Sequence, residues 1–216
     1  MRFFNAILDL IFPTRCLSCK RLGSEFCTDC LSVAPNAERE SAQWIFPAYD
    51  YRHDPIQQAV WLLKYKGKKN LARIFAEAIY GQILEELAGL IQMEDFRNPI
   101  LIPIPLSRSR HKERGFNQAE LICRSLLEID EGHNFSLKTD VLIKTKETEH
   151  QARIENRKER LKNIVGSFRL KNSELIGGKN IILVDDVTTT GATLSEAKKV
   201  LEQAGARKVI AFTFAH

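Results

Sequence analysis

The sequence of 216 residues lacks several features that mark common classes of protein. No run of about 18 apolar residues is present, the length that a membrane-spanning helix needs. No P-loop of the GxxxxGK type, internal repeat or low-complexity segment occurs. The apolar start, residues 1–13, is interrupted by Asn5 and Asp9, and no small-residue cleavage site follows it. We therefore expect a short amphipathic helix there, in a cytoplasmic protein without a membrane span.

What is present suits a globular protein with a mild excess of positive charge. Hydrophobic residues make up 44% of the chain, and the formal net charge is +5. A chain of this length can bury one substantial core and carry a small appendage. The charge suits a polyanionic ligand, such as a pyrophosphate ester or a nucleic acid, but a solvated basic face has the same composition.

Four of the five cysteines are grouped as two CxxC pairs. Cys16 and Cys19 form the first pair, Cys27 and Cys30 form the second, and seven residues separate the pairs. Four thiolates can form a tetrahedral site that suits structural Zn²⁺ and leaves no open position for catalysis. Two disulfides or an unmetallated redox pair are the alternatives, and disulfides are disfavoured without a secretory signal. Cys123 lies in an apolar helical pattern and is expected to be a buried small hydrophobe.

Apolar segments alternate between the periodicities of strands and helices. Strands are predicted over 44–51, 100–105, 141–144, 181–185 and 209–214, and helices over 55–65, 71–90, 118–128 and 194–204. This alternation favours an α/β fold with a parallel, doubly wound sheet. Residues 34–43 are the candidate linker. We therefore predict an N-terminal helix and a four-cysteine zinc-binding module over residues 1–43 and an α/β domain over residues 44–216.

The segment with the most specific chemistry ends the strand predicted over 181–185. Asp185 and Asp186 are followed by a loop of small polar residues from Thr188 to Thr193, and a helical pattern begins directly afterwards. Backbone N–H groups and the helix dipole favour an anion at such a helix start. Paired carboxylates suit sugar hydroxyls or a divalent metal. The three features together indicate a phosphorylated sugar, whereas an aspartate N-cap alone would need neither the second aspartate nor the threonines.

The sequence VDDVTTTGAT, residues 184–193, resembles the phosphoribosyl pyrophosphate (PRPP) signature of type I phosphoribosyltransferases. The resemblance implies a Rossmann-like parallel sheet flanked by helices, an acidic pair on the ribose hydroxyls, a loop around the 5′-phosphate, and Mg²⁺ bound with PRPP. The residues it assigns to PRPP binding are Asp185, Asp186, Val187, Thr188, Thr189, Thr190, Gly191, Ala192 and Thr193.

Further segments resemble the ComF family of phosphoribosyltransferase-like proteins. Residues 103–106 are similar to its PVPL-like strand, and residues 114–118, RGFNQ, match a motif of the family. The resemblance implies a pyrophosphate loop that includes Leu106 and Ser107. It also makes Arg110, together with Asp185 and Asp186, a catalytic candidate, because Arg110 can stabilise the leaving pyrophosphate. The chain differs from the family at Ser107 and Arg108, where His-Pro is frequent.

Three more elements fit the same family. Residues 148–168 resemble its mobile loop, and residues 64–67, KYKG, resemble its lysine-aromatic-x-glycine element. The second of these also fits a basic helix end with a glycine cap. A four-cysteine zinc module before a phosphoribosyltransferase domain is likewise the arrangement found in this family.

The resemblance leaves two functions open. The first is Mg²⁺-dependent transfer of phosphoribose from PRPP to an unknown acceptor, in a protein linked to DNA uptake and natural competence. The alternative is a non-catalytic, PRPP-sensing competence factor or scaffold that binds single-stranded DNA and DNA-uptake proteins. Few aromatic residues interleave with the basic stretch 153–171, which argues weakly against a base-stacking platform. The sequence identifies no acceptor, general base or oligomeric state.

Overall fold

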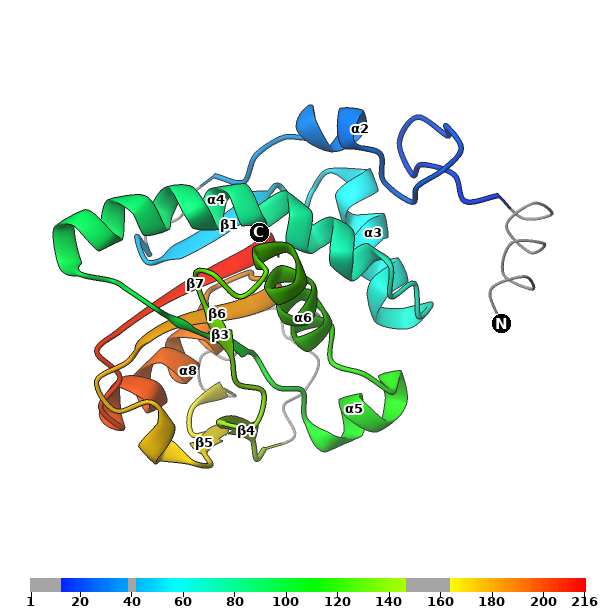
Figure 1. Cartoon of the computed structure of the whole chain (residues 1–216). Helices are drawn as coiled ribbons and strands as arrows, with labels where there is room; N and C mark the ends of the chain where they lie inside the picture. Colours follow the sequence, from blue (N-terminus) through cyan, green and yellow to red (C-terminus); the bar gives the residue numbers. More distant parts are fainter. Residues whose placement is uncertain (1–12, 39–41, 147–163) are drawn as a thin grey trace.

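The computed structural model describes residues 13–38, 42–146 and 164–216. At its centre lies a five-stranded sheet with the strand order β1-β7-β6-β2-β3, in which every neighbouring pair is parallel (Figure 1). The strands are β1 (Ile45–Tyr49), β2 (Ile100–Pro103), β3 (Ser136–Leu137), β6 (Asn180–Val187) and β7 (Lys208–Ala215). The predicted parallel α/β sheet is therefore confirmed.

Helices cover both faces of this sheet (Figure 1). One face packs against α3 (Asp54–Tyr65), α4 (Leu71–Glu94) and α6 (Gln118–Asp130). The other face packs against α8 (Ala192–Gln203) and a small antiparallel sheet of β4 (Leu142–Lys144) and β5 (Phe168–Leu170). Side chains of a strand alternate between faces, so Ile182 contributes to the first core and Leu183 to the second. Because both faces are covered, residues 181–184 of β6 are all apolar.

The N-terminal segment packs on the α3–α4 side of the molecule. Its one helix within residues 13–38 is α2 (Thr28–Ser32). Cys16, Phe26 and Leu31 are buried in the same apolar cluster as the inner faces of α3 and α4. Glu25 also pairs with Lys68 in the α3–α4 connection, at 3.9 Å. The segment therefore shares its core with the sheet domain.

Two predicted elements differ in the structure. The strand predicted over 100–105 ends at Pro103, and the expected basic loop contains helix α5 (Arg108–Arg114). Ser107 occupies the N-cap of α5 and Gly115 ends it in the left-handed conformation, with φ 76°. The strand predicted over 141–144 belongs to the β4–β5 sheet rather than to the parallel sheet. The remaining short element is the 3₁₀ helix η2 (Ser173–Leu175).

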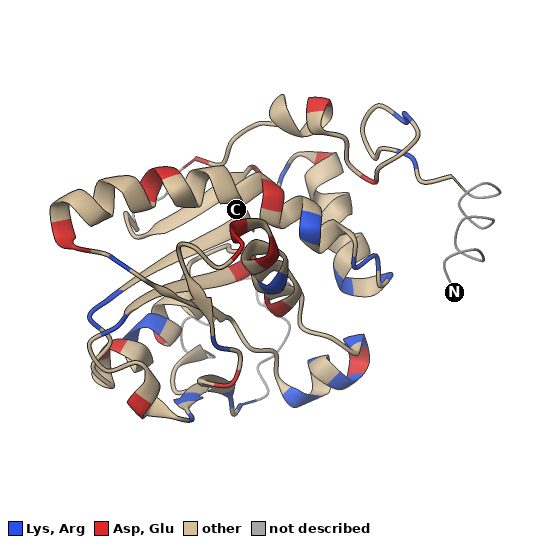
Figure 2. Ribbon diagram, viewed as in Figure 1, with Lys and Arg blue, Asp and Glu red and all other residues tan. Residues whose placement is uncertain are grey.

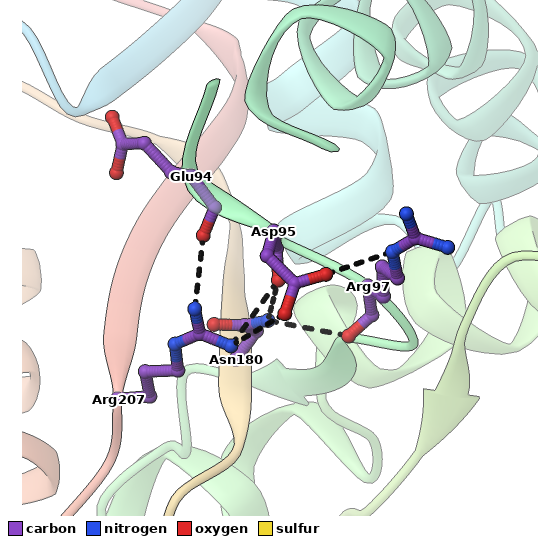
Figure 3. Close-up of polar contacts among 5 residues, drawn as sticks. All are labelled: Glu94, Asp95, Arg97, Asn180 and Arg207. Atoms are coloured by element: carbon purple, nitrogen blue, oxygen red, sulfur yellow. Dashed lines mark hydrogen bonds and ion pairs between the residues drawn. The ribbon is translucent and has the colours of Figure 1, made fainter. Parts of the chain in front are cut away.

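A polar cluster joins the end of α4 to the amino ends of β6 and β7 (Figure 3). Asn180 donates from Nδ2 to the carbonyl oxygens of Asp95 and Arg97, at 3.3 and 3.2 Å. Arg207 donates to the carbonyl oxygen of Glu94 at 3.1 Å and to the Asp95 carboxylate at 3.1 Å. Arg207, followed by Arg97, holds the pKa of Asp95 below its usual range. The cluster closes the sheet edge opposite the carboxyl ends of the strands.

Some predictions lie outside the described residues, namely the N-terminal helix over residues 1–12 and the greater part of the mobile loop, residues 148–163. Within the described ranges, no helix is both long enough and apolar enough to span a membrane.

Candidate functional site

The two aspartates of the predicted signature lie at the carboxyl end of β6. Asp186 is 4% exposed, and its Oδ1 is 3.0 Å from Lys64 Nζ on α3. Asp185 Oδ1 accepts a hydrogen bond from the backbone N–H of Asp186 at 2.9 Å. The carboxyl ends of parallel strands are where α/β sheets bind ligands. The acid pair therefore stands at the expected edge, with one carboxylate already paired with a cation.

Electrostatics at this edge favour an additional positive charge. Burial, followed by the charge of Asp186, raises the pKa of Asp185 to about 7, although Lys64 and Lys144 act in the opposite direction. A carboxyl group with this pKa is partly protonated at neutral pH. A cation, or a ligand hydroxyl that donates to the carboxylate, would favour its ionised form.

The loop between β6 and α8 leads directly into the N-terminus of α8, where backbone N–H groups favour an anion. Gly191 adopts the left-handed conformation, with φ 69°, and provides no side-chain cap for α8. A Cβ at Gly191 would lie 3.1 Å from Ile45 Cδ1, so the position favours glycine for both conformation and space. Thr190 Oγ1 accepts a long bond from Ala192 N at 3.4 Å. Residues 187–194 line a small depression with Asp185, and this geometry suits a phosphate group.

A pocket of about 270 Å³ lies beside the acid pair. Its described lining comprises Tyr51, Trp61, Lys64, Tyr65, Ile104, Arg110, Arg114, Lys144, Asp185, Asp186, Val187, Thr189 and Thr193. Four cations thus come from three separate elements, and Figure 2 shows Lys and Arg along α5 and at the end of α3. Arg110 is brought together with both aspartates. Among the described residues, the lining includes Ile104 rather than the predicted Leu106 and Ser107.

The RGFNQ segment connects α5 to α6 through identifiable contacts. Gly115 ends α5, and Asn117 caps α6 by accepting a hydrogen bond from Ala119 N at 3.1 Å. Asn117 Nδ2 also donates to the carbonyl oxygen of Ile104 at 3.0 Å, which fixes α6 against the end of β2. Arg114 alone of this segment lines the pocket, and its guanidinium lies 5.0 Å from the ring centre of Tyr65. Most of this motif therefore positions the pocket wall rather than forming it.

Several pocket residues were not identified from the sequence. Lys64 lay in a recognised element, but its pairing with Asp186 depends on the packing of α3 on β6. Lys144 and Trp61 come from elements far apart in the chain, and Arg114 was noted only as part of the RGFNQ motif. The sequence offered only a charged side chain for Lys144 and an aromatic one for Trp61, and both are common on any protein surface.

The four paired cysteines converge on one point. Their Sγ atoms all lie within 4.8 Å of one another, and those of Cys19 and Cys27 are 3.7 Å apart. Four sulfurs placed about 2.3 Å from a zinc ion are separated by about 3.8 Å, so the observed arrangement fits a metal. Cys16 is buried, which alone would raise its pKa, but the backbone N–H of Cys27 and its neighbours lower it to about 6. Cys123, as predicted, is buried apart from them, and burial raises the pKa of its thiol well above the usual value.

Comparison with known proteins agrees with this geometry. Residues 112–216 match the model of the phosphoribosyl transferase domain. The chain is 31% identical to competence protein ComFC of Streptococcus pneumoniae, across 97% of the chain and 92% of that protein. It is 30% identical to DNA utilization protein YhgH of Salmonella typhimurium, across 85% of the chain and 74% of that protein. ComFC of Bacillus subtilis is 37% identical across 53% of the chain and 43% of that protein. The chain therefore belongs to the ComF family of phosphoribosyltransferase-like proteins.

Proposed function

We propose that the pocket at the end of β6 binds PRPP and that the protein transfers its phosphoribosyl group to an acceptor. One observation carries the proposal: Asp185 and Asp186, the phosphate-loop start of α8 and the cations of α5 meet at one sheet edge. Carboxylates suit the ribose hydroxyls, the loop suits the 5′-phosphate, and Arg110 suits the pyrophosphate. If the acid pair served only to form an ion pair with Lys64, neither the phosphate loop nor the α5 cations would be needed beside it.

The residues of the pocket suit a transition state with separated charge. As pyrophosphate leaves, positive charge grows on the anomeric carbon and negative charge on the leaving oxygen. Arg110 and Arg114 stand where they can stabilise the leaving anion, while the acid pair fixes the ribose. Mg²⁺, when bound with PRPP, would supply further positive charge to the pyrophosphate. Catalysis therefore depends on positioning and charge stabilisation rather than on a covalent nucleophile.

Isothermal titration with Mg-PRPP tests the binding site. The wild-type chain should bind, and Asp185→Asn combined with Asp186→Asn should abolish binding while the protein stays folded by circular dichroism. Glu85→Gln, on the exposed side of α4, is the control and should bind as the wild type does. Unchanged affinity in the double variant would overturn the site assignment.

A pyrophosphate-release screen tests catalysis separately. Bases, amines and nucleotides are each incubated with PRPP, and released pyrophosphate is measured against the double variant. Release that depends on one acceptor class would establish a transferase. Binding without release from any class would favour the sensing role instead.

A second candidate function is binding of single-stranded DNA. The names of two relatives and one structural observation support it. Two relatives bear the names competence protein and DNA utilization protein. The fold brings aromatic side chains beside the cations, since Lys69 lies 4.9 Å from the ring centre of Phe116 and Arg114 lies against Tyr65. Such interleaving suits base stacking combined with phosphate contacts. Anisotropy with a labelled oligothymidine at several salt concentrations tests it, because phosphate contacts make affinity fall steeply with salt.

The remaining assignments belong to the same proposal. The four-cysteine cluster holds structural Zn²⁺, within a module of residues 1–43 that precedes a phosphoribosyltransferase domain of residues 44–216. A PRPP-dependent function would require access to that metabolite, and a cytoplasmic location is part of the same proposal. DNA-uptake proteins are its candidate partners.

A further inference from the structure

The small β4–β5 sheet brings Lys144 into the pocket at the carboxyl end of β6. Lys144 ends β4 and lines the pocket together with Asp185 and Asp186. Burial raises the pKa of Asp185, and Lys144 is one of the two lysines whose charge opposes that rise. In the described part of the chain, β4 pairs with β5 and forms no hydrogen-bonded ladder with the five-stranded sheet. The position of Lys144 beside the acid pair therefore depends on how the β4–β5 sheet is attached to the rest of the domain.

One peptide bond beside this sheet is held by two side chains of opposite charge. Lys146, two residues after Lys144, donates from Nζ to the carbonyl oxygen of Val165 at 2.9 Å. The N–H of Gly166 donates to Oε1 of Glu196 on α8 at 2.6 Å. The Val165 carbonyl and the Gly166 N–H belong to the same planar peptide bond, so the two charged groups hold it from both ends. Hydrogen bonds to ionised groups are shorter and stronger than those between neutral groups, which makes this a firm attachment.

The backbone on either side of this peptide bond supports the attachment. Gly166 has a φ of 67°, in the left-handed region that favours glycine. Thr145 N donates to the carbonyl oxygen of Ser167 at 2.8 Å, which continues the contact between the two strands beyond their paired residues. Ile164 is 2% exposed and belongs to the apolar cluster that also contains Leu194 of α8. Hydrogen bonds and apolar packing thus join the β4–β5 sheet to α8 at the same place.

The burial of Glu196 distinguishes this contact from a surface hydrogen bond. Glu196 is 8% exposed, and burying a carboxylate costs free energy unless hydrogen bonds satisfy it. The Gly166 N–H satisfies one of its oxygens. Helix α8 begins at Ala192, about one turn before Glu196, and the proposed phosphate site lies at that helix start. The same rigid helix therefore presents the phosphate site and holds the sheet that carries Lys144.

We propose that Glu196 is a positioning residue, which holds the β4–β5 sheet on α8 so that Lys144 supplies its charge to the phosphate groups of the bound ligand. This inference rests on the proposed PRPP function. Glu196 is not part of the described pocket lining, whereas Lys144 is, so Glu196 acts through Lys144 rather than on the ligand. Without this support Lys144 would keep its charge but lose its fixed position, and a binding group is effective only when its supporting contacts hold it in place.

A double-mutant cycle, measured by calorimetry with Mg-PRPP, tests whether Glu196 acts through Lys144. Lys144→Ala should lower the affinity about tenfold and Glu196→Ala about fivefold, because the first removes a charged contact and the second loosens it. The double variant should bind as weakly as Lys144→Ala alone, within about twofold, since no lysine is left to be misplaced. Independent contributions would instead multiply to a loss of about fiftyfold.

Two conservative variants separate the reach of the Glu196 side chain from its charge. Glu196→Gln keeps the length and an oxygen acceptor, so it should retain most of the wild-type affinity. Glu196→Asp keeps the charge but is one methylene shorter, so it should lose affinity as Glu196→Ala does. It also replaces Glu196→Ala in the cycle if that variant does not fold. Glu202→Ala removes an exposed acid of the same helix and is the control, which should bind as the wild type does.

The outcomes distinguish a positioning role from a structural one. A structural role alone would lower the stability of the Glu196 variants in urea and leave the affinity of the folded protein unchanged. Wild-type affinity in folded Glu196→Ala and Glu196→Asp, or losses that multiply in the double variant, would overturn the inference. Failure of the wild type itself to bind Mg-PRPP would sink the proposed function, and this inference with it.

Discussion

Asp185 shows at the scale of one residue how a binding site can conflict with stability. Burial and the adjacent Asp186 raise its pKa to about 7, so the free protein carries a carboxylate in a place that disfavours its charge. Lys64 compensates only in part, because its closest contact is with Asp186. Sites that bind charged ligands commonly carry such a cost, and replacing the responsible group often stabilises the fold.

Asp185→Asn should therefore make the ligand-free protein more stable at pH 8 while it weakens PRPP binding. The folded pKa lies above the ordinary value of 3.8, so the fold retains a proton that the unfolded chain releases between about pH 4 and pH 7. Wild-type stability from this group is thus present at low pH and lost as the pH rises through about 7. Asparagine removes that loss, with an expected gain of about 1–3 kcal/mol at pH 8 and little at pH 4.

Urea unfolding of the wild type and of Asp185→Asn at pH 4.5, 6 and 8 measures the difference between their free energies of unfolding. Titrating groups that both proteins share contribute equally and cancel in this difference. A variant that is less stable than the wild type at pH 8, or a difference that does not change with pH, would contradict the assigned origin of the pKa shift.

At the scale of elements, local segments could be predicted and distant pairings could not. The β6 strand, its loop and α8 form one continuous stretch, so the sequence located both the aspartates and the loop. Helix α5 was missed, because seven mostly basic residues have no apolar periodicity, and its boundaries depend on Ser107 and Gly115. The strand at Leu142–Lys144 was located, but its partner Phe168–Leu170 lies beyond a long connection.

The residues of the candidate site show the same contrast between local motifs and pairings of distant elements. Asp185, Asp186 and Arg110 were named from motifs, and all three line the pocket. Lys64 was named in the KYKG segment, for which a family element and a basic helix end were the two interpretations. Helix α3 does end there, with Lys66 at its C-cap, and Lys64 pairs with Asp186. Trp61 was not singled out, because its place in the pocket lining depends on the packing of α3 beside β6, whereas Tyr65 lay in the KYKG segment.

Asn180→Ala tests how the α4 end is fixed to the sheet (Figure 3). Asn180 is 5% exposed and donates two hydrogen bonds to carbonyl oxygens of the α4–β2 connection. Its loss removes the partner of the Arg97 carbonyl oxygen, while the Asp95 carbonyl oxygen keeps its bond from Arg207 Nη1 at 3.3 Å, so we expect a destabilisation of about 1–2 kcal/mol. Arg97→Ala is the control, since Arg97 is an exposed ion-pair partner worth at most about 1 kcal/mol. Equal effects of the two variants in urea unfolding would show that the buried amide is not the fixing contact.

At the scale of the whole molecule, the cysteine module and the sheet domain share one core. Cys16 is 1% exposed and belongs to the apolar cluster that also holds Phe75 of α4 and Phe212 of β7. A metal that organises the four cysteines therefore also fixes the module side of this core. The module lies away from the pocket lining, so its effect on PRPP binding should come through stability.

Removal of the metal should accordingly lower the thermal stability of the chain as a whole. Protein purified without chelator should hold one zinc ion per chain by elemental analysis, and Cys19→Ser should hold clearly less. Chelation should lower Tm by about 5–10 °C, because Cys16, Phe26 and Leu31 lose their fixed packing against α3 and α4. Cys123→Ala is the control for loss of a thiol outside the cluster, since Cys123 is buried in α6 apart from the four cysteines, and it should retain the metal. Clearly less than one metal per chain in the wild type would reject the site. An unchanged Tm after complete removal of the metal would show that the module and the sheet domain are not coupled through their shared core.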